Sequence, residues 1–251
     1  MKKIIFLLLF LGFQASLMGY YDDAGYKKFK NGWEAVNWWL RLYGNNVLSQ
    51  EEKSIVYQYT YGDFVTINSK LRNGEGLSSL DEKQKEMVKK LDQALGKTII
   101  FENLIVYRYE NLSFIFRLLD KSYFSQIYKD GKFTERAKHY LEFINHKKYR
   151  DYGFMSTTTI RNSVFQSRPV ELVIKVPKYS DALFVSLKGL AAFESQYELL
   201  FPRNRVLSIE SYEISKDHKK LTIYVKMTGP CYINQPCEIE KVDNLKQPKE
   251  F

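Results

Sequence analysis

Histidine and cysteine are scarce in this chain, whose 251 residues contain only three histidines and two cysteines. The histidines, His139, His146 and His218, lie in strongly charged stretches. We therefore expect them at the surface, which argues against a histidine general base. Cys231 and Cys237 have no histidine nearby and make a poor zinc site. A local disulfide and two free thiols both stay open for this pair.

Several motifs of common enzymes are also missing. The sequence has no glycine-rich phosphate loop, no HExxH helix and no GxSxG elbow. These absences argue against P-loop nucleotide hydrolases, zinc proteases and serine hydrolases. Basic residues are interspersed with acidic ones and do not cluster with aromatics, so we expect no nucleic-acid surface. We also expect no metal.

The one long hydrophobic run is residues 4–13, which follows two lysines and precedes several small residues. This pattern predicts a signal peptide over residues 1–19 and a secreted protein with no stable membrane span. Removing that leader leaves 36 basic and 29 acidic residues, a net charge of +7. A positive surplus of this size favours an anionic partner.

Helical periodicity dominates the first half of the chain, over residues 31–44, 48–60, 64–74 and 80–97. Ser49 and Glu52 form a capping-box pattern, and Gly74 and Gly96 are placed to end helices. All three tryptophans are expected in the core: Trp33, Trp38 and Trp39.

Strand-like patterns begin at residue 103 and recur to residue 227, after a mixed stretch over 114–149. The expected strands are 103–110, 170–177, 182–187, 197–202, 205–214 and 221–227. Helices first and strands later predict an α+β fold, with N-terminal helices packed on a mixed or antiparallel β-sandwich core. We expect one domain over residues 20–229 and a C-terminal tail over 230–251.

Polar residues occur at strand edges in a suggestive order. Arg108 follows Tyr107 in a strand, Ser156 opens a Ser-Thr-Thr run, and Gln196 and Glu198 lie two apart. Strand alternation predicts that Gln196 and Glu198 share one face. Each motif alone has an ordinary structural explanation. Together, the order Arg, Ser-Thr-Thr, Gln-x-Glu resembles bacterial mono-ADP-ribosyltransferase toxins, and more closely the Rho-modifying botulinum exoenzymes of the C-three type.

Further matches lie between these motifs. Phe165 and Arg168 resemble the family's aromatic-x-x-Arg-Pro stretch, and Asn68 and Arg72 resemble a helix that contributes to the cofactor's phosphates. Phe193 resembles an exposed aromatic on the target-recognition turn. The resemblance runs from about residue 30 to about residue 228 and implies an ADP-ribosyltransferase fold.

The resemblance also implies a function and a set of roles. NAD would be the co-substrate, and the acceptor would be an asparagine of a host Rho-type GTPase, modified in the host cytosol. Glu198, Gln196 and Ser156 would be catalytic, Phe193 would recognise the target, and a further set would bind NAD: Asn68, Arg72, Arg108, Phe165 and Arg168. We expect a monomer.

Two alternatives stay open at this point. An arginine-specific transferase acting on actin or another host protein would belong to the same family. Arginine-modifying relatives carry Glu at the position of Gln196, which argues against this alternative. A catalytically inactive secreted protein that binds NAD or another anion is the second alternative. Glu194 lies in the expected turn before the strand, and we expect its loss to matter least.

Overall fold

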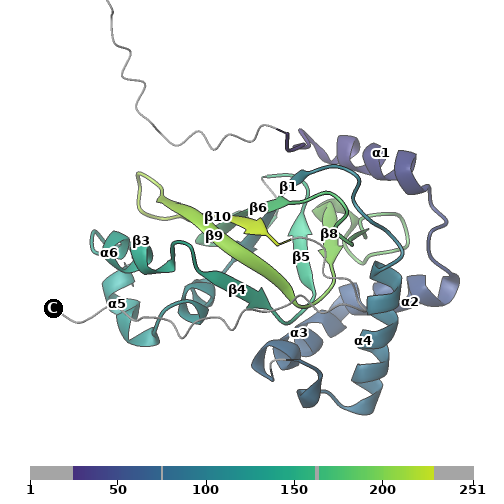
Figure 1. Ribbon diagram of the computed structural model, residues 1–251, viewed down its shortest axis with the longest axis horizontal. Helices are drawn as coiled ribbons and strands as arrows, with labels where there is room; N and C mark the ends of the chain where they lie inside the picture. Colours follow the sequence, from purple (N-terminus) through teal and green to yellow (C-terminus); the bar gives the residue numbers. More distant parts are fainter. Residues whose placement is uncertain (1–24, 75, 162–163, 229–251) are drawn as a thin grey trace, which may run out of the picture.

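The structure, a computed structural model, describes residues 25–74, 76–161 and 164–228. The expected leader, both cysteines and the expected tail lie outside the described residues. Within the described part, helices come first and strands dominate after residue 103, as predicted for an α+β chain (Figure 1).

The four N-terminal helices follow the predicted ranges, and the last three of them gather at one end of the molecule while the first lies apart from them (Figure 1). They are α1 (Gly32–Tyr43), α2 (Gln50–Gln58), α3 (Phe64–Asn73) and α4 (Glu82–Leu95). The capping box of Ser49 and Glu52 is confirmed, because each side chain bonds the other's backbone N–H. A π-helical turn, η1 (Tyr59–Asp63), joins α2 to α3 and was not predicted.

Eight strands form one mixed sheet in the order β4-β9-β10-β6-β1-β5-β8-β7. Only β6 and β10 pair in parallel among the described strands. The strands are β1 (Leu104–Glu110), β4 (Lys148–Asp151), β5 (Met155–Thr158), β6 (Val170–Val176), β7 (Leu183–Phe184), β8 (Glu198–Phe201), β9 (Arg205–Ile214) and β10 (Leu221–Met227).

The sheet has a narrow junction in its middle. β1 and β5 are paired through a single register position, Tyr107 opposite Thr158. On the other side of β1, seven positions pair with β6. The sheet therefore consists of a five-stranded wing and a three-stranded wing that meet at this point, and the space beside the junction is available for a site.

The stretch between β1 and β4 is mixed, as predicted, and lies at the end of the molecule opposite α2–α4 (Figure 1). It contains short helices and a small hairpin: η3 (Leu112–Arg117), η4 (Lys121–Tyr123), α5 (Phe124–Ile127), β2 (Tyr128–Lys129), β3 (Lys132–Phe133), α6 (Ala137–Leu141) and η5 (Glu142–Ile144).

The main core lies between the N-terminal helices and the sheet. Trp39 of α1, Leu71 of α3 and Leu91 of α4 are buried in it together with strand residues such as Val106 and Leu199. Each fully buried side chain of this size stabilises the fold by about 1.5–3 kcal/mol before entropy is counted. Among the described residues, no helix combines the length and apolar character that crossing a membrane requires.

The prediction that all three tryptophans are core residues is wrong for Trp33. Trp38 and Trp39 are buried, whereas the Trp33 side chain is 76% exposed. The buried positions of α1 follow Ala35, Trp38 and Trp39, and Trp33 projects from the opposite side of the helix. Helical spacing alone places apolar residues on two sides of α1, and only packing decides which side is buried.

Candidate active site

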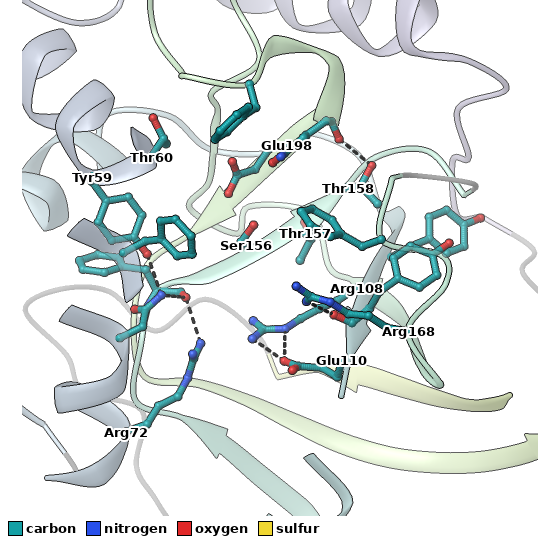
Figure 2. A pocket seen from close by; sticks show the side chains of 18 residues that line it. Tyr59, Thr60, Arg72, Arg108, Glu110, Ser156, Thr157, Thr158, Arg168 and Glu198 are labelled. Carbon is teal, nitrogen blue, oxygen red and sulfur yellow. Dashed lines mark hydrogen bonds and ion pairs between the residues drawn. The ribbon is translucent and has the colours of Figure 1, made fainter. Parts of the chain in front are cut away.

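One cavity of about 460 Å³ lies where the two wings of the sheet meet (Figure 2). Its walls come from η1, α3, β1, β5, β8, the 165–168 segment and the turn before β8. All nine residues selected from the sequence line it: Asn68, Arg72, Arg108, Ser156, Phe165, Arg168, Phe193, Gln196 and Glu198. The fold thus brings the whole set together.

Glu198 and Gln196 enter the cavity from two different backbone elements. Glu198 is the first residue of β8, whereas Gln196 ends a 3-10 turn, η6 (Glu194–Gln196). Tyr197 between them has a left-handed backbone with φ of 48°. The prediction that Gln196 and Glu198 project from one face of a strand is therefore wrong, because strand alternation begins only at Glu198.

The end of the hydroxyl-rich strand β5 and the residue after it hold this turn in place. The Thr158 hydroxyl donates a hydrogen bond to the carbonyl of Gln196 at 2.9 Å. The backbone N–H and the hydroxyl of Thr159 both donate to the carbonyl of Tyr197, each at 3.0 Å. The two carbonyls that flank the left-handed residue are thus fixed from the neighbouring strand.

Glu198 is a buried carboxyl in a polar cavity, with only 8% of the residue exposed. Burial raises its pKa, and a hydrogen bond from Ser156 and the positive charge of Arg108 act in the opposite direction without cancelling the rise. Ser156 reaches Glu198 diagonally across the strand pair, because Thr158 is the residue directly opposite Glu198. Figure 2 shows Ser156 between Glu198 and the arginines.

A buried carboxylate that the sequence did not single out, Asp151, organises two of the arginines. It accepts hydrogen bonds from Nε of Arg72 at 2.7 Å and from Nη1 of Arg108 at 3.1 Å. Arg108 also donates from Nε to Glu110 at 2.6 Å. Asp151 ends β4 in a polar stretch, and nothing in its sequence neighbourhood marks it as part of a site.

The charge of Asp151 is stabilised by its partners. Burial acts to raise the pKa of Asp151, but the positive charges of Arg108 and Arg72, with hydrogen bonds from Arg72 and the N–H of Gly153, hold it below the ordinary value. Asp151 is therefore ionised and holds both guanidinium groups beside the cavity.

Asn68 clamps the chain that leads into β5. Its carboxamide oxygen accepts from the N–H of Phe154 at 2.8 Å, and its Nδ2 donates to the hydroxyl of Tyr59 at 2.9 Å. A Cβ on Gly153 would lie 2.7 Å from the Asn68 oxygen, so only glycine allows this close approach. Asn68 thus positions Phe154 and the strand that carries Ser156.

Arg168 and Phe165 form the side of the cavity opposite α3. The guanidinium of Arg168 lies 4.6 Å from the centre of the Phe165 ring and donates to the carbonyl of Tyr109 at 2.8 Å. Within the described part of the chain, no carboxylate lies within ion-pair distance of Arg168. The Arg168 guanidinium therefore keeps N–H donors available for an anionic ligand.

Sequence reasoning selected Asn68 and Arg72 of α3 but missed the rest of the helical side of the cavity. Tyr59, Thr60 and Phe64, from η1 and the start of α3, line it together with Asn68. Burial raises the pKa of Tyr59, and the negative charge of Glu198 adds to this rise, so Tyr59 stays a neutral hydroxyl. A tyrosine-rich stretch around Gly62 was the only available signal.

The chemistry of the cavity is divided between its two ends. Arginines held by Asp151, together with Arg168, suit phosphate oxygens, and the buried carboxyl of Glu198 faces the other end. Among the described residues, no group of three or more His, Cys, Asp or Glu side chains could hold a metal ion.

Comparison with known proteins gives a consistent result. The sequence model of the "ADP-ribosyltransferase exoenzyme" family matches residues 14–229. The chain is 31% identical over 206 residues to the epidermal cell differentiation inhibitor of Staphylococcus aureus, covering 80% of this chain and 83% of that protein. It is 29% identical to mono-ADP-ribosyltransferase C3 of Clostridium botulinum D phage, covering 81% and 80%.

Solved structures of the same kind match the fold. The crystal structure of C3stau2 from S. aureus with NAD has a TM-score of 0.73 and 26% identity, and the match covers 82% of this chain and 99% of that one. The C3 exoenzyme of Clostridium limosum gives a TM-score of 0.72 at 25% identity, with 81% and 98% covered. The chain therefore belongs to the ADP-ribosyltransferase exoenzyme family, and it is an NAD-dependent mono-ADP-ribosyltransferase of the C3 type.

Proposed function

We propose that this enzyme transfers ADP-ribose from NAD to an asparagine side chain of a host Rho-type GTPase and releases nicotinamide. The observation that carries the proposal is the buried Glu198 carboxyl at the head of β8, with Gln196 at the mouth of the same cavity. In the reaction, the bond between nicotinamide and the ribose carbon breaks, and the acceptor amide nitrogen bonds that carbon and loses a proton.

Glu198 serves the bond-breaking step. Loss of nicotinamide leaves positive charge on the ribose, as in glycoside hydrolysis. An ionised carboxylate beside that ring stabilises the charge, and burial strengthens the effect because little water screens it. The Ser156 hydroxyl orients the carboxylate across the strand pair.

The arginine end of the cavity fits the pyrophosphate of NAD. Arg168 has no carboxylate partner in the described part of the chain, and Arg72 and Arg108 are held by Asp151. Phe165, stacked under Arg168, offers an aromatic face to a planar ring. Asn68 is saturated by Tyr59 and Phe154, so we assign it a positioning role instead of a direct phosphate contact.

Gln196 supports the choice of an amide acceptor. Within the described chain, no hydrogen bond is found to its carboxamide, which lies at the cavity wall and is partly exposed. A carboxamide offers one donor group and one acceptor group and so matches the amide of an asparagine. Phe193, three residues earlier and 53% exposed, would contact the target beside that amide.

Family membership and the leader pattern extend the proposal to where the protein acts. Residues 1–19 would direct secretion, residues 20–229 would form the transferase domain, and the monomeric enzyme would act as a virulence factor in the host cytosol. No metal takes part in this proposal.

The proposed function is tested by incubating the purified protein with labelled NAD and RhoA, and following both label in RhoA and free nicotinamide. Wild type should label RhoA. Glu198→Gln should lose about 100-fold or more of both activities, since a single charge-stabilising group is removed. Glu194→Gln, a carboxylate four residues earlier, serves as the matched control and should remain close to wild type. Absence of both labelling and nicotinamide release by wild type would refute the proposal.

A further inference from the structure

Four apolar side chains on the helical side of the cavity are exposed to solvent. They belong to α2, η1 and α3, and we call them the aromatic patch: Tyr57, Tyr61, Phe64 and Val65. Tyr61 is 70% exposed and Val65 61%. The rings of Tyr57 and Tyr61 stack at 6.1 Å, so part of the patch is already ordered before any partner binds.

The π-helical turn η1 explains how the same short segment serves both the cavity and the surface. Tyr59 and Thr60 are buried and line the cavity, whereas Tyr61 points outward. Figure 2 shows Tyr59 and Thr60 at the left, across the cavity from Arg168. Single π-turns inside helices often occur at functional sites, because they redirect side chains at a cost in helix stability.

A hydrogen bond joins this segment to the turn that carries Phe193. The N–H of Ala192 donates to the Thr60 hydroxyl at 3.3 Å. Phe64 of the aromatic patch and Phe193 of the turn both line the cavity and are both exposed. The exposed apolar surface therefore continues from the turn, past the cavity mouth, to the aromatic patch.

We propose that the aromatic patch is a docking surface for the acceptor protein of the transferase reaction. The inference rests on the proposed function only in requiring that a protein side chain enters this cavity. Exposed apolar surface beside the mouth of a cavity indicates a binding surface, and these four exposed side chains lie within one nine-residue segment, 57–65.

The position of the patch selects a protein occupant over NAD. Tyr57, Tyr61 and Val65 do not line the cavity, so a ligand held inside it leaves them exposed. A folded acceptor that brings an amide to Glu198 must cover the mouth, including Phe64 and Phe193. The complementary surface on the acceptor should be apolar, because aromatic side chains contribute most to the binding free energy where apolar contacts exclude water from them.

The test compares transfer to a protein with NAD hydrolysis in the double variant Tyr61→Ser, Val65→Ser. The expected result is that kcat/KM for RhoA falls about 10-fold or more, mainly through KM, while nicotinamide release without acceptor is unchanged. Tyr61→Phe should retain transfer because it keeps the ring. Phe124→Ser, on α5 and 46% exposed, is the matched control on a remote surface and should also retain transfer.

The outcomes separate this inference from the proposed target. If wild type does not label RhoA, the Rho proposal fails, and the same variants are compared for total label transferred to proteins of a mammalian cell lysate at limiting enzyme. Equal transfer by wild type and the double variant, with either acceptor, would overturn the docking surface. A parallel loss of nicotinamide release would overturn it as well, since the patch would then act through the cavity.

Discussion

The ring of Tyr197 lies directly against the α-carbon of Gly32, the first residue of α1. A Cβ at Gly32 would lie 1.9 Å from Cε1 and 2.0 Å from Cζ of that ring. Tyr197 is the left-handed residue between Gln196 and Glu198, and its carbonyl is held by Thr159. The first helix thus fixes the turn that presents both residues to the cavity.

Gly32→Ala should therefore impair both stability and transfer. The ring of Tyr197 must move out, and an overpacked site of this kind costs about 1–3 kcal/mol. Displacing Gln196 and Glu198 by a fraction of an ångström to one ångström should reduce transfer about 10-fold or more. Urea unfolding and transfer of labelled ADP-ribose check the two effects.

The control for this variant is Gly62→Ala, because a Cβ at Gly62 meets nothing within 4 Å. Truncating the ring in the double variant Gly32→Ala, Tyr197→Ala should recover stability relative to the sum of the single changes. If the stability changes of the two single variants add up to that of the double variant, the contact between Gly32 and Tyr197 is not the cause of the lost stability.

Glu198→Gln should stabilise the protein at neutral pH while removing activity. Burial raises the pKa of Glu198, so the folded state holds this proton more tightly than the unfolded chain does. Stability from this group is present at low pH and is lost as pH rises through the folded pKa. Glu198→Gln has no ionisable group at this position, so its stability does not fall as pH rises through that pKa. Urea midpoints measured across this range should show an advantage for the variant that disappears on acidification, and a constant difference would contradict the assignment.

The same raised pKa predicts the acid side of the pH–activity profile. In the proposed reaction, Glu198 is ionised when it stabilises positive charge on the ribose, so nicotinamide release should fall at a higher pH than for an ordinary glutamate. Ser156→Ala removes a hydrogen bond that favours the charged form and should move this limb to still higher pH. An unchanged limb in Ser156→Ala would argue against the role of Ser156.

Asp151→Asn should destabilise the fold strongly. Asp151 is ionised and paired with Arg72 and Arg108, and removing one charge from a buried network costs about 3 kcal/mol or more. Because its pKa is lowered in the folded state, the stability it contributes is present at neutral pH and is lost as pH falls through that value. Glu82→Gln, in an exposed pair with Lys85, should cost less than about 0.5 kcal/mol in the same assay. Similar small costs for both variants would contradict the proposed network.

Gln196→Glu should separate hydrolysis from transfer. Gln196 lies on the turn outside β8, and a carboxylate there no longer donates to an acceptor amide. Transfer to RhoA should fall more than nicotinamide release does. Equal losses would mean that Gln196 acts on NAD instead of on the acceptor.

Local sequence patterns were enough to predict most elements of this fold. The ranges of β9 and β10 agree with the predicted strands residue by residue, and the helix caps at Ser49 and Gly96 lie where expected. These signals are local, because capping and strand alternation depend on neighbours in the chain.

The parts that the sequence did not predict depend on contacts between distant segments. Asp151 acquires its role only when β4 meets α3 and β1, and Tyr197 adopts its left-handed backbone under contacts from α1 and β5. Trp33 was misplaced because the exposed side of α1 is decided by packing. The nine residues selected through ordered motifs line one cavity, but such motifs do not predict the hydrogen bonds between them, and the roles assigned to these residues stay predictions.

The most direct test of the account is to identify the modified residue by mass spectrometry after wild-type protein is incubated with host lysate and NAD. We expect a single ADP-ribose on an asparagine of a Rho-type GTPase. Modification of an arginine, or of actin without Rho, would contradict the role assigned to Gln196 and the proposed target together.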